Sequence, residues 1–198
     1  MVRSVTAADE PALAAVAARA FEHDPIWTWI VPDERTRLDR LTRFFEVMGR
    51  RVFAPAGRHR LTTTDLAGMA VWAPPGTWRV SPVRMLPAVP GMVRALGSGT
   101  RRVARFSSYL EKKHPAEPHW YLEMLATAPA HQRRGVGAEL VAPVLERCDT
   151  EGILAYLETE TDANVPYYRR HGFDVTEEVD IPGGGPHLWL MARPPRPR

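Results

Sequence analysis

The sequence of 198 residues contains a single cysteine, Cys148. One thiol excludes an internal disulfide, and free thiols persist in a reducing compartment, so we expect a cytoplasmic protein. Cys148 falls on the apolar side of a predicted helix, which favours a small buried hydrophobic residue over a nucleophile. The first residues begin directly with strand-like and helix-like patterns, so no signal peptide is predicted.

Long apolar runs and a strong excess of one charge are also absent. No apolar stretch approaches about 18 residues, which excludes a membrane-spanning helix, and the hydrophobic content of 44% is ordinary for a globular chain. The net charge is +3, with 26 basic and 23 acidic residues. The arginines are spread along the chain without interleaved aromatic residues, so we predict neither a nucleic-acid partner nor a membrane partner.

Several catalytic and ligand-binding motifs are missing. The seven histidines show no spacing with acids or cysteine that is typical of zinc sites, so no metal is expected. There is no Gly-x-Ser-x-Gly motif of a hydrolase. There is also no Lys-Ser/Thr ending of a nucleoside-triphosphate loop and no Gly-x-Gly-x-x-Gly of a dinucleotide fold. The missing motifs argue against a zinc site, a serine hydrolase site, and a binding site for a nucleoside triphosphate or a dinucleotide.

The segment 131–138 reads His-Gln-Arg-Arg-Gly-Val-Gly-Ala and is the most informative stretch. An apolar, strand-like run over 120–127 precedes it, and a helix-like run over 139–148 follows. A strand, a tight turn and a helix N-terminus direct backbone N–H groups at one point, where the helix dipole favours an anion. A Cβ atom at Gly135 or Gly137 would hold a phosphate away from these amides. We therefore predict a phosphate-binding turn.

A second motif follows the run 153–159, which is apolar on both faces, as in a parallel strand covered by helices. It consists of Asn164, then the pair Tyr167 and Tyr168, then Gly172 and Phe173. Two motifs in this order, the first of the form Gln/Arg-x-x-Gly-x-Gly/Ala, resemble the GCN5-related N-acetyltransferase (GNAT) superfamily.

The resemblance covers roughly residues 118–193, and within the superfamily the pattern is most similar to puromycin N-acetyltransferase-like members. It implies one α/β domain over 1–198 with a GNAT fold. That fold has a central mixed, mostly antiparallel sheet of about six to seven strands flanked by helices, in which the parallel strands 120–127 and 153–159 splay apart. Residues 81–114 would be a helical insertion, which either covers the acceptor pocket or forms a subunit interface, and 194–198 a frayed tail. Dimers are common in the superfamily, so a homodimer is one expected assembly.

The resemblance also implies acetyl-CoA as the cosubstrate. Backbone groups of Leu125 and Thr127 would hold the pantetheine amides as an added strand does. Asn164 would either bond the pantetheine or cap its helix. The residues expected to bind acetyl-CoA are Leu125, Ala126, Thr127, Gln132, Arg133, Arg134, Gly135, Val136, Gly137, Ala138, Asn164 and Tyr168.

Three residues are predicted to take part in catalysis. Tyr168 matches the tyrosine of the family's second motif, and a phenol with a pKa of about 10 can protonate a thiolate with a pKa of about 8.5. The backbone N–H of Leu125 is the expected oxyanion donor. Glu123 lies two residues before Leu125, so both are expected on one strand face, where Glu123 would be the general base. Glu123 could equally pair with an arginine.

His23, Asp24 and His119 are the alternative bases. The acceptor is expected to contact His23, Trp27, Trp29 and Trp72, unless the tryptophans simply pack on the sheet. We therefore expect an acetyl-CoA-dependent N-acetyltransferase that modifies a primary amine by direct transfer through a tetrahedral intermediate. A small molecule, such as an antibiotic or aminonucleoside, is favoured as the acceptor. The alternative is a catalytically idle GNAT fold that binds acyl-CoA as a sensor or partner module.

Overall fold

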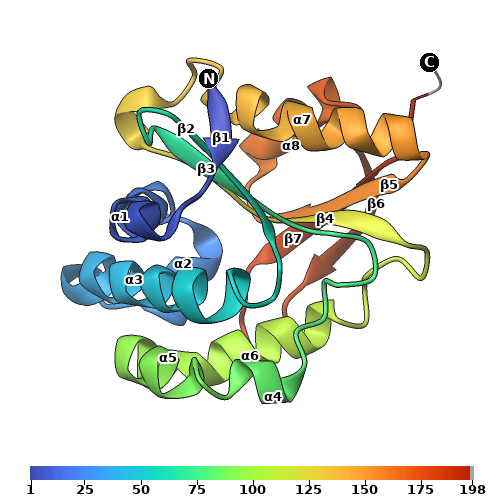
Figure 1. Ribbon diagram of the computed structural model, residues 1–198. Helices are drawn as coiled ribbons and strands as arrows, with labels where there is room; N and C mark the ends of the chain where they lie inside the picture. Colours follow the sequence, from blue (N-terminus) through green and yellow to red (C-terminus); the bar gives the residue numbers. More distant parts are fainter. Residues whose placement is uncertain (197–198) are drawn as a thin grey trace.

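The computed structural model describes residues 1–196, in which seven strands form one sheet between two layers of helices (Figure 1). The strand order is β1-β2-β3-β4-β5-β7-β6, and only the β4–β5 pair is parallel. This confirms the predicted mixed, mostly antiparallel sheet. The strands are β1 (Val2–Ser4), β2 (His59–Thr63), β3 (Gly68–Ala73), β4 (His119–Thr127), β5 (Leu154–Thr159), β6 (Asp174–Asp180) and β7 (His187–Arg193).

Helices α7 and α8 lie on one side of the sheet, and α1 to α6 lie on the other (Figure 1). Short 3-10 turns cover Ala7–Asp9, Pro129–His131 and Asp162–Asn164, and a π-helical turn covers Gly49–Phe53. The α-helices are α1 (Glu10–Ala20), α2 (Pro25–Ile30), α3 (Glu34–Met48), α4 (Pro82–Met85), α5 (Val89–Leu96), α6 (Gly99–Leu110), α7 (Val136–Glu151) and α8 (Val165–Arg170).

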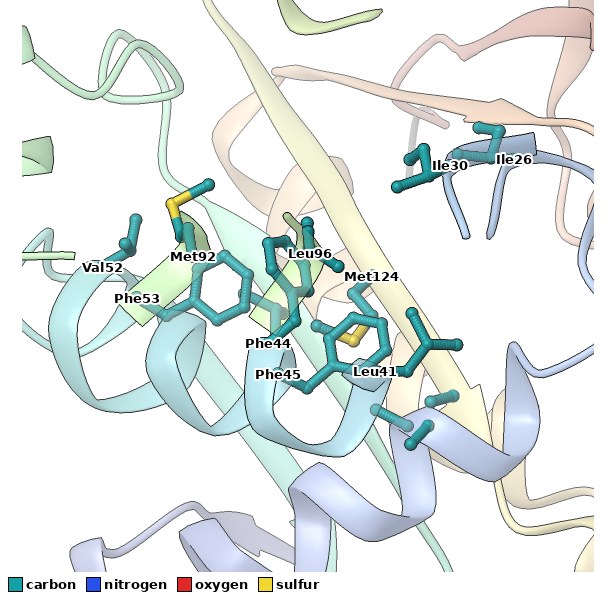
Figure 2. Close-up of a cluster of buried hydrophobic side chains, with 14 of the residues drawn as sticks. Ile26, Ile30, Leu41, Phe44, Phe45, Val52, Phe53, Met92, Leu96 and Met124 are labelled. Carbon is teal, nitrogen blue, oxygen red and sulfur yellow. The ribbon is translucent and has the colours of Figure 1, made fainter. Parts of the chain in front are cut away.

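The larger hydrophobic core lies between the sheet and helices α1, α3 and α5. Leu41, Phe44 and Phe45 recur at three- and four-residue spacing, so α3 buries one apolar stripe. Figure 2 shows these side chains beside Met92 of α5 and Met124 of β4. A second core, between the sheet and α7, holds apolar residues from the opposite sheet face. The two cores therefore fix the sheet from both sides and hold its centre rigid.

The segment between α1 and α3 is tied down by a buried arginine. Arg37 of α3 is only 6% exposed and donates to the carbonyl oxygens of Val31 at 2.7 Å, Glu22 at 3.1 Å and Pro32 at 3.0 Å. Asp24 caps the short helix α2 by accepting from the N–H of Ile26 at 2.9 Å. This segment, which was expected to contact the acceptor, is thus held in one position.

Residues 81–114 contain α4, which packs against the π-helical turn, α5, which packs against α3, and α6, which packs against α2. Arg102 of α6 donates to the carbonyl oxygen of Trp29 at 2.8 Å, which fastens the helix to α2. The stretch ends at His114, beside the centre of the sheet. At the other end of the chain, the N–H of Arg196 donates to Asp149 at 2.7 Å, and residues 197–198 of the predicted tail lie outside the described residues.

Strands β4 and β5 pair only over His119–Tyr121 and Leu154–Tyr156, and then separate as predicted. Strand β4 also contains a bulge, because Leu122 opposes Trp72 whereas Met124 opposes Val71. Glu123 is therefore an extra residue without an opposite partner, and the alternation of faces breaks there. The expectation that Glu123 and Leu125 share a face is wrong for this reason.

Candidate active site

A cleft of about 920 Å³ runs from the turn before α7, along the end of β4, to α8 and the start of α2. It brings together most of the residues that the sequence indicated. The predicted residues that line it are His23, Leu125, Thr127, Gln132, Arg133, Gly135, Val136, Gly137, Ala138, Asn164 and Tyr168. The cleft therefore joins the predicted phosphate turn to the predicted acid.

The fold itself also requires the glycines of the turn before α7, and their predicted role in the approach of a phosphate stays a prediction. Gly135 is the residue before the helix and has φ +86°, a left-handed conformation that glycine adopts without strain, and a Cβ atom there would meet nothing within 4 Å. A Cβ atom on Gly137 would lie 2.7 Å from the hydroxyl oxygen of Tyr167. Conformation at Gly135 and close approach of Tyr167 at Gly137 thus require these residues.

The start of α7 offers backbone donors to the cleft. The first N–H groups of a helix have no intrahelical acceptor, and the residue before α7 is a glycine without a capping side chain. The side chain of Gln132 donates to the carbonyl oxygen of Thr127 at 3.3 Å, which ties the turn to the end of β4. The N–H groups of Val136, Gly137 and Ala138 are therefore positioned to bind an anion.

Tyr168 of α8 lies at the inner part of the cleft and is 9% exposed. Its ring packs edge-on against Phe173, with ring centroids 5.9 Å apart. Burial raises the pKa of Tyr168 above its usual value, and the neighbouring Tyr167 and Glu160 act in the same direction. The phenol is consequently neutral and holds its proton, as a general acid requires.

Two further residues also line the cleft: Asn164, the residue before α8, and Tyr167 of α8. Asn164 makes no capping hydrogen bond to the helix, and its side chain donates to Thr159 Oγ1 at 3.1 Å. Asn164 therefore does not cap the helix, and the bond to the pantetheine stays a prediction. Tyr167 also lines the cleft; its hydroxyl has no hydrogen-bond partner among the described residues, and burial raises its pKa to about 12.

Five of the residues predicted to bind acetyl-CoA or the acceptor lie elsewhere. Ala126 is 1% exposed and part of the larger core, whereas Arg134 is exposed and does not line the cleft. Trp72 is fully buried in the core beneath α7. Trp27 packs between Phe44 and Phe45, and the ring of Trp29 lies 5.8 Å from the Arg102 guanidinium. The tryptophans therefore pack in the fold, the second of the two possibilities that the sequence left open.

Glu123 forms an ion pair with Arg58. Both carboxylate oxygens accept from this guanidinium at 2.7 Å, and Arg58 also donates to the carbonyl oxygens of Thr77 at 2.7 Å and Trp78 at 2.8 Å. Burial raises the pKa of Glu123, whereas the Arg58 contact lowers it. Pairing with an arginine, the alternative role for Glu123, is thus the arrangement that the structure contains.

A group of buried acids near the splay was missed by sequence reasoning. Glu158 of β5 has a side chain that is 6% exposed, and burial raises its pKa to about 7, against the opposing effect of the Tyr121 and Tyr156 hydroxyls. Burial and the nearby Asp24 carboxyl raise the pKa of Glu160 well above its usual value. The signal was present, since acids at 158 and 160 share one face at the end of an apolar strand.

Aromatic and imidazole rings surround Glu158. His114 stacks on Trp78 with ring centroids 3.7 Å apart and meets Tyr156 at 5.0 Å. Burial lowers the pKa of His114 to about 3, so its ring is neutral. His119, an alternative base, is 1% exposed and bonds to the carbonyl oxygen of Glu117 at 2.8 Å, so it reaches the site only through His114.

Comparison with known proteins identifies the family. The model of the acetyltransferase (GNAT) family matches residues 23–173. The chain belongs to this family. An uncharacterized N-acetyltransferase of Schizosaccharomyces pombe is 26% identical over 189 residues, which cover 89% of this chain and 75% of the yeast protein. Membership of the GNAT family confirms the expected acetyltransferase assignment and acetyl-CoA as the cosubstrate, while the puromycin-like subtype stays a prediction.

Solved structures show the same GNAT fold. One, described as histone acetyltransferase HPA2 and related acetyltransferase, from Corynebacterium glutamicum, has a TM-score of 0.75 and 25% identity, covering 100% of this chain and 97% of that one. The PaiA N-acetyltransferase from Thermoplasma acidophilum, solved in complex with coenzyme A, has a TM-score of 0.57 and 14% identity, covering 98% of each chain. Within residues 1–196, the GNAT domain has no group of side chains suited to a metal ion and no helix long and apolar enough to cross a membrane.

Proposed function

We propose that this protein transfers the acetyl group of acetyl-CoA directly to the primary amine of a small molecule. The observation that carries the proposal is the continuous cleft, which extends from the backbone donors of α7 to the buried hydroxyl of Tyr168. A polyanionic donor with a long pantetheine arm needs both features, an anion site at one end and a proton donor at the other.

The residues present fit acetyl-CoA. The N–H groups at the start of α7 would hold the pyrophosphate, and the end of β4, which has no β5 partner beyond Tyr121, leaves space for the pantetheine. Leu125 lines the cleft, so its N–H is available as the predicted oxyanion donor, a contribution of about 2.7–4 kcal/mol in comparable sites. Asn164 would contact the pantetheine, because its side chain faces the cleft and does not cap α8.

The chemistry follows from these positions. The amine nitrogen attacks the thioester carbon to form a tetrahedral intermediate, whose oxyanion accepts from Leu125. As the C–S bond breaks, Tyr168 gives its proton to the departing sulfur. A phenol kept neutral by burial retains a proton to donate throughout the physiological pH range.

Acids at the cleft support an amine acceptor, because carboxyl groups attract a cation. Asp24 lines the cleft and lies close to Glu160. An antibiotic-like or aminonucleoside amine is our preferred acceptor, and the cytoplasm, where acetyl-CoA is made available to such enzymes, our preferred location. The homodimer stays a prediction that analytical ultracentrifugation can test.

The test is release of the CoA thiol from acetyl-CoA at about pH 8 across puromycin, aminoglycosides, polyamines, amino acids and lysine peptides. Turnover with a small amine, greatly reduced by Tyr168→Phe, would support the proposal. Turnover only with lysine peptides would replace the small molecule with a protein acceptor. Tight acetyl-CoA binding without any turnover would favour the idle sensor, and absence of acetyl-CoA binding would overturn the proposal.

A further inference from the structure

Two histidines beside Glu158 have tautomers that their hydrogen bonds determine. The Nδ1 atom of His119 lies 2.8 Å from the carbonyl oxygen of Glu117, which only accepts, so this nitrogen carries a hydrogen. The Nε2 atom of neutral His119 is then an acceptor, and it lies 3.1 Å from His114 Nδ1. His114 must donate from Nδ1, which leaves a lone pair on its Nε2.

That lone pair faces a carboxylate. His114 Nε2 lies 3.7 Å from Glu158 Oε1, and the two side chains are 4% and 6% exposed. Within residues 1–196, Glu158 Oε1 has no donor in hydrogen-bond geometry, although the Tyr121 and Tyr156 hydroxyls lie near this carboxyl and lower its pKa. When Glu158 is ionised, the two buried acceptors face each other without a hydrogen between them, which is unfavourable for both. A donor from outside the chain, placed between the two atoms, would supply that hydrogen.

The surroundings favour a cationic donor. Among the described residues, no lysine or arginine forms an ion pair with Glu158 or Glu160, and aromatic rings beside a carboxylate attract ammonium groups. The ring of Tyr121 meets His114 edge-on at 4.5 Å. The titratable and charged groups around the pair come from β4, β5, β6 and the flanking loops: Arg79, His119, Tyr121, Glu123, Tyr156, Glu160 and Glu177.

Glu158 lies close along the chain to residues of the cleft. It follows Tyr156, the last β5 residue that pairs with β4, and precedes Thr161, which lines the cleft. Asp24 also lines the cleft and lies close to Glu160. Acidic groups thus extend from the cleft to the base of the splay.

We propose that Glu158 Oε1 and His114 Nε2 together bind the primary ammonium group of the acceptor, and that the Glu158 carboxylate removes its proton. The inference rests on the proposed function and names the base that the function needs. An N–H proton passes from the ammonium group to Glu158, the freed nitrogen pair forms the N–C bond, and the C–S bond breaks. The sulfur takes the Tyr168 proton, and the second N–H proton of the tetrahedral intermediate returns to Tyr168 through solvent. Glu158 releases its proton to solvent, so one proton is released per acetyl group transferred.

The first experiment uses the full chain without acetyl-CoA and requires no known acceptor. Nitrogen-15 NMR of histidine-labelled protein at pH 8, above the pKa of about 7 of Glu158, reports the protonation of each imidazole nitrogen. We expect His114 Nε2 to be unprotonated and to shift saturably with methylammonium. Tetramethylammonium, which carries the charge without an N–H donor, is the matched control and should leave it unchanged.

Two variants test whether Glu158 is responsible for the methylammonium shift at His114. Glu158→Gln should abolish the methylammonium shift, whereas Glu178→Gln, an exposed acid on β6, should retain it. A protonated His114 Nε2, no response to methylammonium, or an equal response to both cations would overturn the proposal. These readouts use wild-type protein, so they decide the question even where a variant does not fold.

The second experiment uses the amine with the highest turnover from the panel above. Glu158→Gln should lower kcat about 100-fold or more and remove the fall in kcat/KM below about pH 7. His114→Phe, which retains the ring stack on Trp78, should raise the amine KM more than it lowers kcat. Unchanged kcat and pH profile in Glu158→Gln would overturn this assignment and leave the proposed function intact. Binding of methylammonium without turnover of any amine would overturn the proposed function and leave the ammonium-binding site intact.

Discussion

The two ends of the cleft are built from different parts of the chain. The donor end consists of backbone groups from the consecutive residues 131–138, arranged by a turn and a helix start. The acceptor end that we propose consists of side chains, among them Asp24, which lines the cleft, and His114, Tyr121 and Glu158, which come from segments far apart in the sequence. A site made of local backbone leaves a motif that can be read, whereas a site made of distant side chains leaves only scattered residues.

Tyr168 lies where the two ends meet, so its removal should have the largest effect. Tyr168→Phe should reduce kcat by about 10²–10⁴-fold, because the thiolate loses its proton donor, while acetyl-CoA affinity changes little. Steady-state kinetics and calorimetric titration measure the two quantities. Tyr167→Phe is the matched control and should retain most of kcat. A large loss of kcat in Tyr167→Phe, with a small loss in Tyr168→Phe, would show that Tyr167 is the general acid.

The ion pair beside the acceptor end should contribute to stability and not to proton transfer. Arg58→Met leaves Glu123 buried without its partner, which should lower the free energy of unfolding by about 3–5 kcal/mol. Urea denaturation measures the loss. Lys113→Met, which breaks the exposed contact with Glu177, should change stability little. If Arg58→Met lowered the free energy of unfolding as little as Lys113→Met does, the Arg58–Glu123 ion pair would not be the role of Glu123, and Glu123 could act as a base.

The donor end should be sensitive to backbone conformation. Gly135→Ala forces a Cβ atom into a left-handed conformation, a strain of about 1–2 kcal/mol, and should weaken acetyl-CoA binding about tenfold as the turn relaxes. Gly152→Ala introduces the same strain at the other end of α7, where φ is +67°, and serves as the control. It should lower the melting temperature similarly without changing affinity. Equal affinities in both variants would contradict a backbone-built anion site.

The smallest effect is expected at Arg134. Its side chain is exposed and does not line the cleft, so Arg134→Ala should change the acetyl-CoA binding free energy by less than about 0.5 kcal/mol. Calorimetric titration at two salt concentrations would detect a long-range charge contribution. A tenfold loss of affinity would show that side chains, as well as backbone, build the donor end.

Local patterns predicted most of the fold. The apolar runs at 120–127 and 153–159, with a helix between them, indicated a parallel pair, and the sheet contains it. The error at Glu123 arose because a β-bulge depends on how β3 and β4 are paired, which period-two alternation cannot reveal. Trp72 was misplaced for a similar reason, since a large aromatic residue near a predicted pocket can equally fill the core.

The amino-acid sequence by itself determined the family, the splayed strands and the phosphate turn, because each depends on residues that are neighbours along the chain. Only the tertiary structure placed His114 against Glu158 and paired Glu123 with Arg58. Packing also decided that an arginine pairs with Glu123, whereas no lysine or arginine within residues 1–196 forms an ion pair with Glu158. Desolvation and partner choice are properties of the packed chain, and no short stretch of sequence contains them.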